Sequence, residues 1–131
     1  MKPGSVTELK AMLVGLDPQL SKRAWCFHHL TDPRFIPDTA FAVIREEEGA
    51  SCIIPAEAGP ADAVRFAKIT LSIASDLEAV GLTAAVSNAL AMAGIACNII
   101  AGHNHDHLFV PWDRREDAME RLTKLSLDAR R

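Results

Sequence analysis

Residues 68–94 read KITLSIASDLEAVGLTAAVSNALAMAG, and this stretch decides the fold. Apolar Ile69, Leu71 and Ile73 alternate with polar residues, as in a strand that buries one face. From residue 82 the apolar residues recur at helical spacing instead, up to Gly94, which suits a helix end. The segment therefore predicts a strand followed by a helix. The expected buried stripe of that helix consists of Leu82, Val86, Leu90 and Ala93.

Two more strands and a second helix are expected after it. Residues 95–101 and 107–110 are short and apolar, and Pro111 ends the second strand because proline cannot donate to a sheet. A helix then begins near Asp113, with a buried stripe of Ala118, Met119, Leu122 and Leu125. The order strand, helix, strand, strand, helix predicts a split β-α-β arrangement. We expect an α+β, ferredoxin-like fold: an antiparallel sheet with helices on one face.

The first half of the chain has weaker patterns. Ser5 and Glu8 match a capping box before a helix that ends near Gly15. Strands are expected at 24–30, 41–45 and 52–54. The last two flank the acidic residues 46–49, which we interpret as a solvated turn rather than a cation site. Residues 55–60 suit a connector. We therefore expect two tandem halves, 1–60 and 61–131. Because the second half lacks a last strand, residues 24–30 are expected to complete its sheet.

Composition excludes several classes of protein. The 131 residues include 14 basic and 17 acidic side chains, a net charge of -3, which lacks the basic surplus of nucleic-acid-binding proteins. Residues 79–102 carry no charge and are long enough to span a bilayer. Polar Thr83, Asn88 and Asn98, together with the many alanines, argue against insertion.

The location of the protein is expected to be the cytoplasm. Pro3, Gly4 and Glu8 interrupt any signal-peptide core. The three cysteines are far apart, lie in apolar stretches and show no metal-binding spacing, so buried, reduced thiols are expected. They are Cys26, Cys52 and Cys97.

Several of these residues resemble a known family. The string Gly81-Leu-Thr-Ala-Ala-Val86, followed by Leu90, Gly94-Ile95 and Asn98-Ile99, is similar to the helix and second strand of ACT domains. The longer string from Ser75 to Val86, ending in Asp106-His-Leu-Phe-Val-Pro111, resembles a family of small two-unit ACT-like proteins, mostly without assigned function. The resemblance departs from the ACT pattern at Val80, where a proline is usual.

The resemblance implies two ACT-like units, a tendency to form homodimers, and binding of an amino acid or similar small molecule. Ligand sites of ACT-like proteins lie at the start of the first helix and on the following strand. A helix start offers free amide groups to a carboxylate, and Gly81 permits close approach of the backbone. The matching positions are Ser75, Asp76, Leu77, Glu78, Val80, Gly81, Leu82, Asn98, Ile99 and Gly102.

These residues also have purely structural interpretations. Ser75 and Glu78 match a capping box, with Asp76 as a favourable charge at the helix start. Asn98 is explained equally well by a backbone hydrogen bond at a strand end. The sequence leaves the structural and ligand-binding interpretations open.

The run His103-Asn-His-Asp-His107 allows four interpretations. The favoured interpretation is a polar turn between two strands, with His107 bonded to the backbone or to Asp106. A contribution to ligand binding, a metal site and catalysis like that of histidine-triad nucleotide hydrolases are the alternatives. No nucleophile elbow, Walker loop or dinucleotide fingerprint is present in the sequence.

The sequence thus predicts a regulatory or sensor module that binds a small molecule, without catalytic residues, metal ligands or cofactor. Neither nucleic acid nor membrane is expected as a partner. The alternatives are the nucleotide hydrolase, built on the three histidines of residues 103–107, and an interaction module that binds no ligand.

Overall fold

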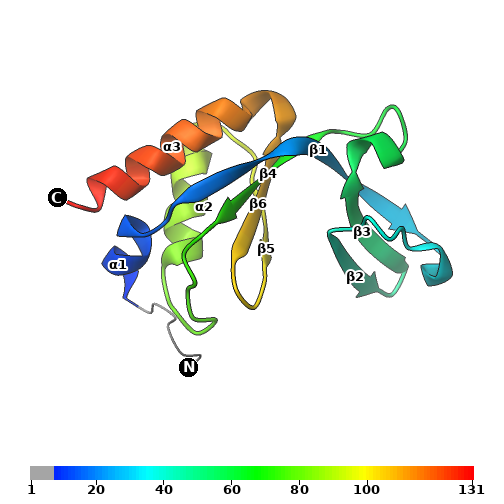
Figure 1. Ribbon diagram of the computed structural model, residues 1–131, viewed down its shortest axis with the longest axis horizontal. Coiled ribbons are helices and arrows are strands. Elements are labelled where there is room, and N and C mark those ends of the chain that lie inside the picture. The colour runs from blue at the N-terminus through cyan, green and yellow to red at the C-terminus, as the bar shows by residue number, and fades with distance from the viewer. Residues whose placement is uncertain (1–7) are drawn as a thin grey trace. The chain divides into compact units, whose positions relative to one another are not determined.

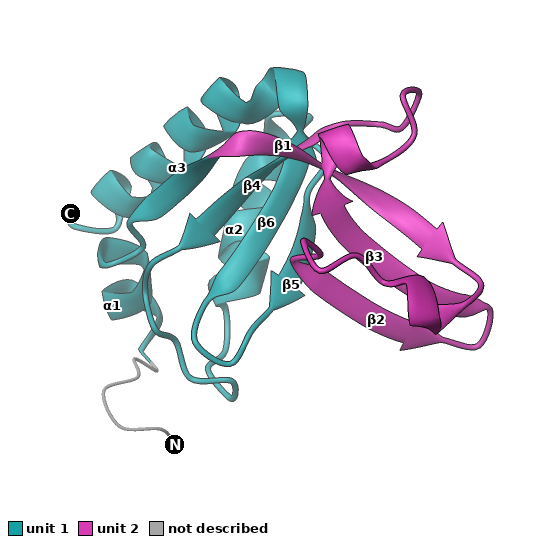
Figure 2. Ribbon diagram, turned by 45° about the vertical axis from the view of Figure 1, so that its right-hand side comes forward, with its two compact units in different colours: residues 1–21, 67–131 teal, residues 22–66 magenta. Residues whose placement is uncertain are grey.

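The computed structural model describes residues 8–131 (Figure 1). Their contacts form two compact units (Figure 2). Unit 1 combines the chain up to residue 21 with residues 67–131, and unit 2 comprises residues 22–66. Strand β1 (Pro18–Leu30) begins in unit 1 and continues into unit 2. The division into two ACT-like halves at residue 60 stays a prediction.

Unit 1 contains a sheet with the strand order β1-β4-β6-β5. β4 alternates buried and half-buried residues, as its sequence predicts. β5 and β6 form an antiparallel hairpin in which Ile99 lies opposite Leu108. The later strands are β4 (Phe66–Leu71), β5 (Asn98–Ala101) and β6 (Asp106–Pro111).

Helices pack on the apolar face of this sheet. They are α1 (Leu9–Val14), α2 (Leu82–Met92) and α3 (Arg115–Asp128). One core cluster joins all three helices to β4 and β6, which confirms the α+β, ferredoxin-like fold. Its buried members are Met12, Leu16, Ala67, Ile69, Leu71, Leu82, Val86, Leu90, Ile95, Leu108, Val110, Ala118 and Leu122.

The strand that the second half lacks is supplied by the beginning of β1. Pro18 follows Asp17, whose φ of 44° turns the chain into the strand. The Ser72 N–H donates to the Leu16 carbonyl at 3.1 Å and to the Asp17 carbonyl at 3.2 Å, which aligns this end of β1 with β4. The predicted strand 24–30 is therefore part of β1, the neighbour of β4 in the sheet order, but β1 begins earlier than predicted, at Pro18, and its residues 25–30 also pair with β3.

Unit 2 is a three-stranded arrangement. β2 (Ala42–Glu46) and β3 (Gly49–Pro55) form the predicted hairpin, with residues 47 and 48 as its turn, and β3 also pairs with β1. Gly49 has a φ of 139°, and a Cβ there would lie 2.3 Å from the Leu30 carbonyl oxygen. Only glycine fits this position. Two short 3-10 helices complete the unit, η1 (Pro33–Phe35) and η2 (Ala56–Ala58).

The end of α2 explains why the next strand is shorter than predicted. Gly94 has a φ of 72°, its N–H donates to the Ala91 carbonyl, and the Ile95 N–H donates to the Leu90 carbonyl. These bonds form a Schellman motif, so Ile95 closes the helix and enters the core. β5 consequently begins at Asn98 rather than at residue 95.

The other helix ends agree in part with the sequence patterns. Glu8 is the N-cap of α1, and its carboxylate accepts the N–H groups of Lys10 and Ala11. The Ser5 part of the expected capping box lies outside the described residues. α3 begins at Arg115, after the 3-10 turn η3 (Trp112–Arg114). Of its predicted stripe, Ala118 and Leu122 are fully buried, whereas Met119 and Leu125 are half-buried against the core.

The three cysteines are free thiols. Cys26 and Cys52 are buried, as predicted, and Cys97 is half-buried. Burial raises the pKa of the Cys97 thiol to about 11, so this side chain stays protonated at neutral pH.

Candidate functional site

A cleft of about 140 Å³ lies in unit 1 where the loop after β4 leads into α2. One wall is that loop with the first residues of the helix. The other wall is the end of β5 with the turn into β6. The lining residues are Ser75, Asp76, Leu77, Ala79, Gly81, Leu82, Thr83, Ala101, Gly102, His105 and Asp106.

Asp76 organises the loop wall. This residue is only 9% exposed, and its Oδ1 accepts the Glu78 N–H at 2.9 Å. Its backbone carbonyl accepts the Ala79 N–H at 3.0 Å. The carboxylate thus stabilises a turn, as Asp side chains often do, and belongs to the cleft lining at the same time.

The capping-box interpretation of Ser75 and Glu78 is wrong. α2 begins at Leu82, six positions after Asp76, and its N-cap is Gly81 with a φ of 106°. No side chain caps this helix start, and no acidic residue lies in its first turn. The first amide groups of an α-helix have no partner within the helix. An uncapped helix start therefore forms one side of the cleft.

The opposite wall is a tight turn. The Gly102 N–H donates to the His105 carbonyl at 2.9 Å, and a Cβ at residue 102 would lie 2.8 Å from that oxygen. Glycine is thus needed for close approach of the backbone. The Nδ1 of His105 is buried and has no hydrogen-bond partner. Buried polar atoms are usually paired, so this ring nitrogen is an exception in the part of the chain that is described.

The structure brings together six of the ten predicted site residues. Glu78 and Val80 lie in the same loop but outside the cleft lining, and Val80 is 83% exposed. Asn98 and Ile99 stand at the beginning of β5, whereas the cleft lies at its end. The six that line the cleft are Ser75, Asp76, Leu77, Gly81, Leu82 and Gly102.

Five lining residues were not among the predicted site residues. Two of them lie on the wall formed by the loop and α2, next to predicted positions, and the other three belong to the end of β5 and the turn into β6, whose place opposite α2 depends on tertiary packing. For the residues of the turn, the sequence signal was the histidine run, for which a contribution to ligand binding was one alternative. The additional residues are Ala79, Thr83, Ala101, His105 and Asp106.

The histidine run forms the predicted polar turn, but its side chains reach different surroundings. His105 lines the cleft, whereas the Nδ1 of His107 lies 2.9 Å from the Thr70 Oγ1 and shares a hydrogen bond with it. Thr70 is a partner that the sequence did not predict. Burial, followed by the charges of Lys68 and His105, lowers the pKa of His107. No group of three potential metal ligands occurs within residues 8–131.

None of the helices within the described range is both long enough and apolar enough to cross a bilayer. The uncharged residues 79–102 are divided between a loop, α2 and β5. As the helical spacing of the apolar residues predicted, α2 is amphipathic: it buries one side, at Leu82, Val86 and Leu90.

Comparison with solved structures identifies similar proteins. A Vibrio cholerae protein of unknown function, described as a possible transport protein, is 35% identical, with a TM-score of 0.77 over 86% of this chain and 92% of that one. An Agobacterium tumefaciens protein is 17% identical, with a TM-score of 0.65 over 79% of this chain and 84% of that one.

A third similar structure is the regulatory subunit of aspartate kinase from Thermus thermophilus. It is 12% identical, with a TM-score of 0.61 over 85% of this chain and 97% of that one. This likeness concerns the fold alone. No curated protein matches the sequence.

A family model described as an ACT domain matches residues 64–124. This range holds β4, α2, β5, β6 and most of α3, together with every residue that lines the cleft. The fold and the sequence therefore lead to the same conclusion: the chain is an ACT-like protein, and its residues 64–124 match an ACT domain.

Proposed function

We propose that the protein is a regulatory module without catalytic activity that binds a small amino acid, or a similar small zwitterion, in the cleft of unit 1. One observation carries the proposal. The cleft combines an uncapped helix start with the carboxyl groups of Asp76 and Asp106 in a single small space. These are complementary groups for a ligand with a carboxylate at one end and an ammonium group at the other.

The carboxylate of the ligand is proposed to lie at the start of α2. The amide groups there point along the helix axis and carry the positive end of the helix dipole. Gly81 and Thr83 line the cleft at this point, and Gly81 has no side chain that would keep a ligand from the backbone. The arrangement favours a compact anionic group.

The ammonium group is proposed to bind Asp76. A carboxylate has about four acceptor positions, one of which accepts the Glu78 N–H. Its 9% exposure means that little water competes for the charge. Asp106 and His105, on the opposite wall, are placed to contact the ligand's side chain or its ammonium group.

The volume of the cleft limits the ligand. At about 140 Å³ it is smaller than the pockets of drug-sized ligands, which span about 300–1,000 Å³. A nucleotide does not fit such a space, and His105 and His107 have separate surroundings rather than a shared one. These facts favour a small metabolite over the substrate of a nucleotide hydrolase.

The wider setting belongs to the same proposal. A cytoplasmic location is supported by the three cysteines, which form no disulfide. The net charge of -3 speaks against nucleic acid as a partner. A homodimer is proposed as the functional form.

The test is thermal unfolding of the protein with each of the common amino acids in turn. A ligand that binds only the folded protein raises its stability by about 2.7 kcal/mol at a concentration near 100 Kd. Asp76→Asn keeps an oxygen that accepts the Glu78 N–H but removes the charge. We expect this variant to fold normally and to bind the selected amino acid about tenfold more weakly, by titration calorimetry.

Glu78→Gln is the matched control, because Glu78 neighbours Asp76 but lies outside the cleft lining. It is expected to bind like the parent protein. The proposal fails if no amino acid stabilises the parent, or if both variants weaken binding equally.

A further inference from the structure

The turn between β5 and β6 contains a buried polar atom without a partner. Among residues 8–131, nothing forms a hydrogen bond with the Nδ1 of His105. The backbone of the same residue closes the turn, because its carbonyl accepts the Gly102 N–H at 2.9 Å. Burying a polar atom without a partner is unfavourable, and water can pair such an atom when the chain around it opens. The closed turn therefore has a cost that an open turn does not have.

His107 connects this turn to the neighbouring strand β4. Its Nδ1 shares a hydrogen bond of 2.9 Å with the Thr70 Oγ1. The opposite edge of the ring borders the turn, since a Cβ at Gly102 would lie 3.7 Å from the His107 Nε2 and 3.9 Å from its Cδ2. Gly102 also lines the cleft. A displacement of the His107 ring consequently acts on a wall of the cleft.

The surroundings of His107 are unfavourable for a positive charge. Burial, followed by the charges of Lys68 and His105, lowers the pKa of His107. Lys68 stands two positions before Thr70 in β4 and so shares its face of the sheet. A proton on the ring is therefore more stable when the ring moves into water.

The remaining neighbours of His107 are apolar, exposed or on the other face of the sheet. On β5, the residue opposite His107 is the apolar Ile100. Asp106 precedes His107 in β6, and the alternation of side chains along a strand directs it to the other face, where it lines the cleft. His103 is exposed in the turn.

We propose that the turn from Gly102 to His105 is a switch operated by protons, in which protonation of His107 opens the turn and withdraws one wall of the cleft. In the closed form His107 is neutral, bonded to Thr70 and packed against Gly102. In the open form the charged ring is hydrated, the bond from the Gly102 N–H to the His105 carbonyl is broken, and water pairs the His105 Nδ1. Acid shifts the population toward the form that binds the proton more tightly, which is the open form.

The switch responds to mild acid. An exposed histidine has a pKa near 6.5, and the closed form takes up a proton only at a lower pH. The turn is consequently closed at about pH 7.5 and opens as the pH falls below about 6.5. Binding of an amino acid in the cleft weakens over the same range, a consequence that rests on the proposed function.

Amide hydrogen exchange of the full chain, followed by NMR, tests the switch without any ligand. Protection of the Gly102 N–H, relative to an unfolded chain at the same pH, is expected to fall about tenfold from about pH 7.5 to about pH 5.5. The Ile95 N–H, bonded to the Leu90 carbonyl at 3.0 Å, is the internal control and should keep its protection. An equal fall at both amides would indicate general loosening of unit 1 and would contradict the switch.

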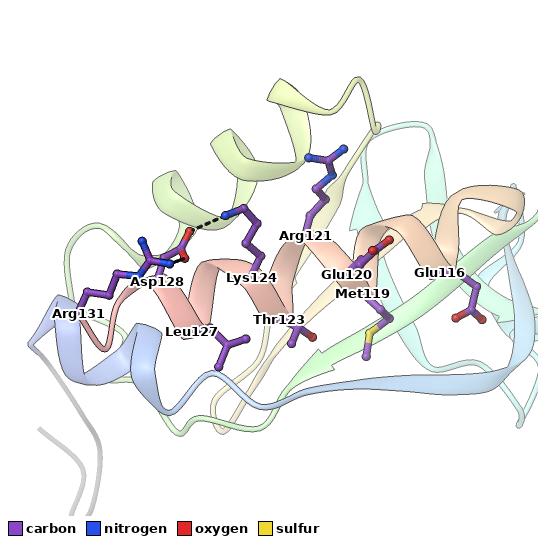
Figure 3. A pocket seen from close by; sticks show the side chains of 9 residues that line it. All are labelled: Glu116, Met119, Glu120, Arg121, Thr123, Lys124, Leu127, Asp128 and Arg131. Carbon is purple, nitrogen blue, oxygen red and sulfur yellow. Dashed lines mark hydrogen bonds and ion pairs between the residues drawn. The ribbon is translucent and has the colours of Figure 1, made fainter.

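Two variants test whether His107 operates the turn. His107→Gln cannot be charged but keeps a group that can bond to Thr70, so the protection of Gly102 should become independent of pH. Thr70→Val removes the partner of the ring, and the protection of Gly102 should be about threefold lower already at neutral pH. Thr123→Val is the matched control, because Thr123 is exposed in the shallow groove along α3 (Figure 3), and it should leave Gly102 unaffected.

Titration calorimetry tests the effect of the switch on the cleft. The probe is the common amino acid that raises the unfolding temperature of the protein most. Its Kd is expected to rise about fivefold from about pH 7.5 to about pH 5.5 in the parent protein and to stay constant in His107→Gln.

Two results overturn the inference: protection of Gly102 that does not change between the two pH values, or a His107→Gln variant with the pH response of the parent. The ligand proposal fails separately. Loss of protection in acid, in a protein that binds no amino acid, supports the switch and removes the receptor. Binding of an amino acid at both pH values with equal affinity, together with a turn that stays closed, does the reverse.

Discussion

Unit 1 and unit 2 are stabilised in different ways. Thirteen buried residues, eleven of them from three helices and two strands, form the core of unit 1. The corresponding cluster of unit 2 has four buried members, Cys26, Ala50, Cys52 and Ile54, of which three are small. Buried apolar area is the main favourable contribution to folding. The comparison indicates that packing contributes more to the stability of unit 1 than to that of unit 2, in which strand pairing and a few close backbone contacts matter more.

The largest expected effect comes from the core of unit 1. Leu122 of α3 is fully buried, so Leu122→Ala removes packing from the centre of the cluster. We expect the free energy of unfolding, measured with urea, to fall by about 2–5 kcal/mol. Leu127→Ala on the exposed side of the same helix is the control, with an expected loss below about 1 kcal/mol. Equal losses in the two variants would contradict the comparison.

A smaller and more local effect is expected in unit 2. A Cβ at Gly59 would lie 2.4 Å from the Cys26 Sγ, although the backbone there allows any residue, with a φ of -101°. Gly59→Ala is therefore expected to cost about 1–3 kcal/mol through overpacking. Amide hydrogen exchange should accelerate in β1 and β3 but not in α2 or α3.

Adding Cys26→Ala to Gly59→Ala removes the sulfur atom that the new methyl group meets. The double variant should regain part of the lost protection, as coupled neighbours do. Accelerated exchange throughout unit 1 would show that the two units do not differ in stability as proposed.

The smallest expected effect is the pH dependence of stability that arises from His107 in unit 1. The fold lowers the pKa of His107, so the unfolded chain takes up a proton at a higher pH than the folded protein does. Stability is therefore unaffected above the pKa of the unfolded state, near 6.5, and declines as the pH falls below it. His107→Gln should show a weaker decline between about pH 7 and pH 5 in urea titrations. A profile as steep as that of the parent would assign the decline to other groups.

Much of the fold of unit 1 was predictable, because its segments have clear periods. The alternation around Ile69 and Leu71 predicted β4, and the stripe through Val86 and Leu90 predicted α2; both are confirmed. The boundaries were less predictable. The Schellman motif assigns Ile95 to the helix end, although its apolar neighbours suggest a strand.

The beginning of β1 was missed for a physical reason. Residues 18–23 are mostly polar, and Pro18 and Asp17 usually indicate a loop. Pairing with the chain near Ser72, far away in the sequence, imposes the strand. No local pattern contains this information.

The candidate site was predictable on one wall only. The helix start at Gly81 and the loop at Asp76 were expected, and both line the cleft. The wall at His105 depends on how the turn after β5 folds back, which is decided by the close approach of Gly102 to the His105 carbonyl. The sequence alone offered that turn and a metal site as alternatives.

The strand shared by the two units has a consequence for how the protein is made. β1 leaves the ribosome early, but β4, its neighbour in unit 1, follows only after all of unit 2 has been synthesised. The residues of unit 2 are continuous in the chain and so can fold as they appear. Until β4 is available, the part of β1 that belongs to unit 1 has no neighbouring strand there, and its exposed edge can pair with wrong partners during translation.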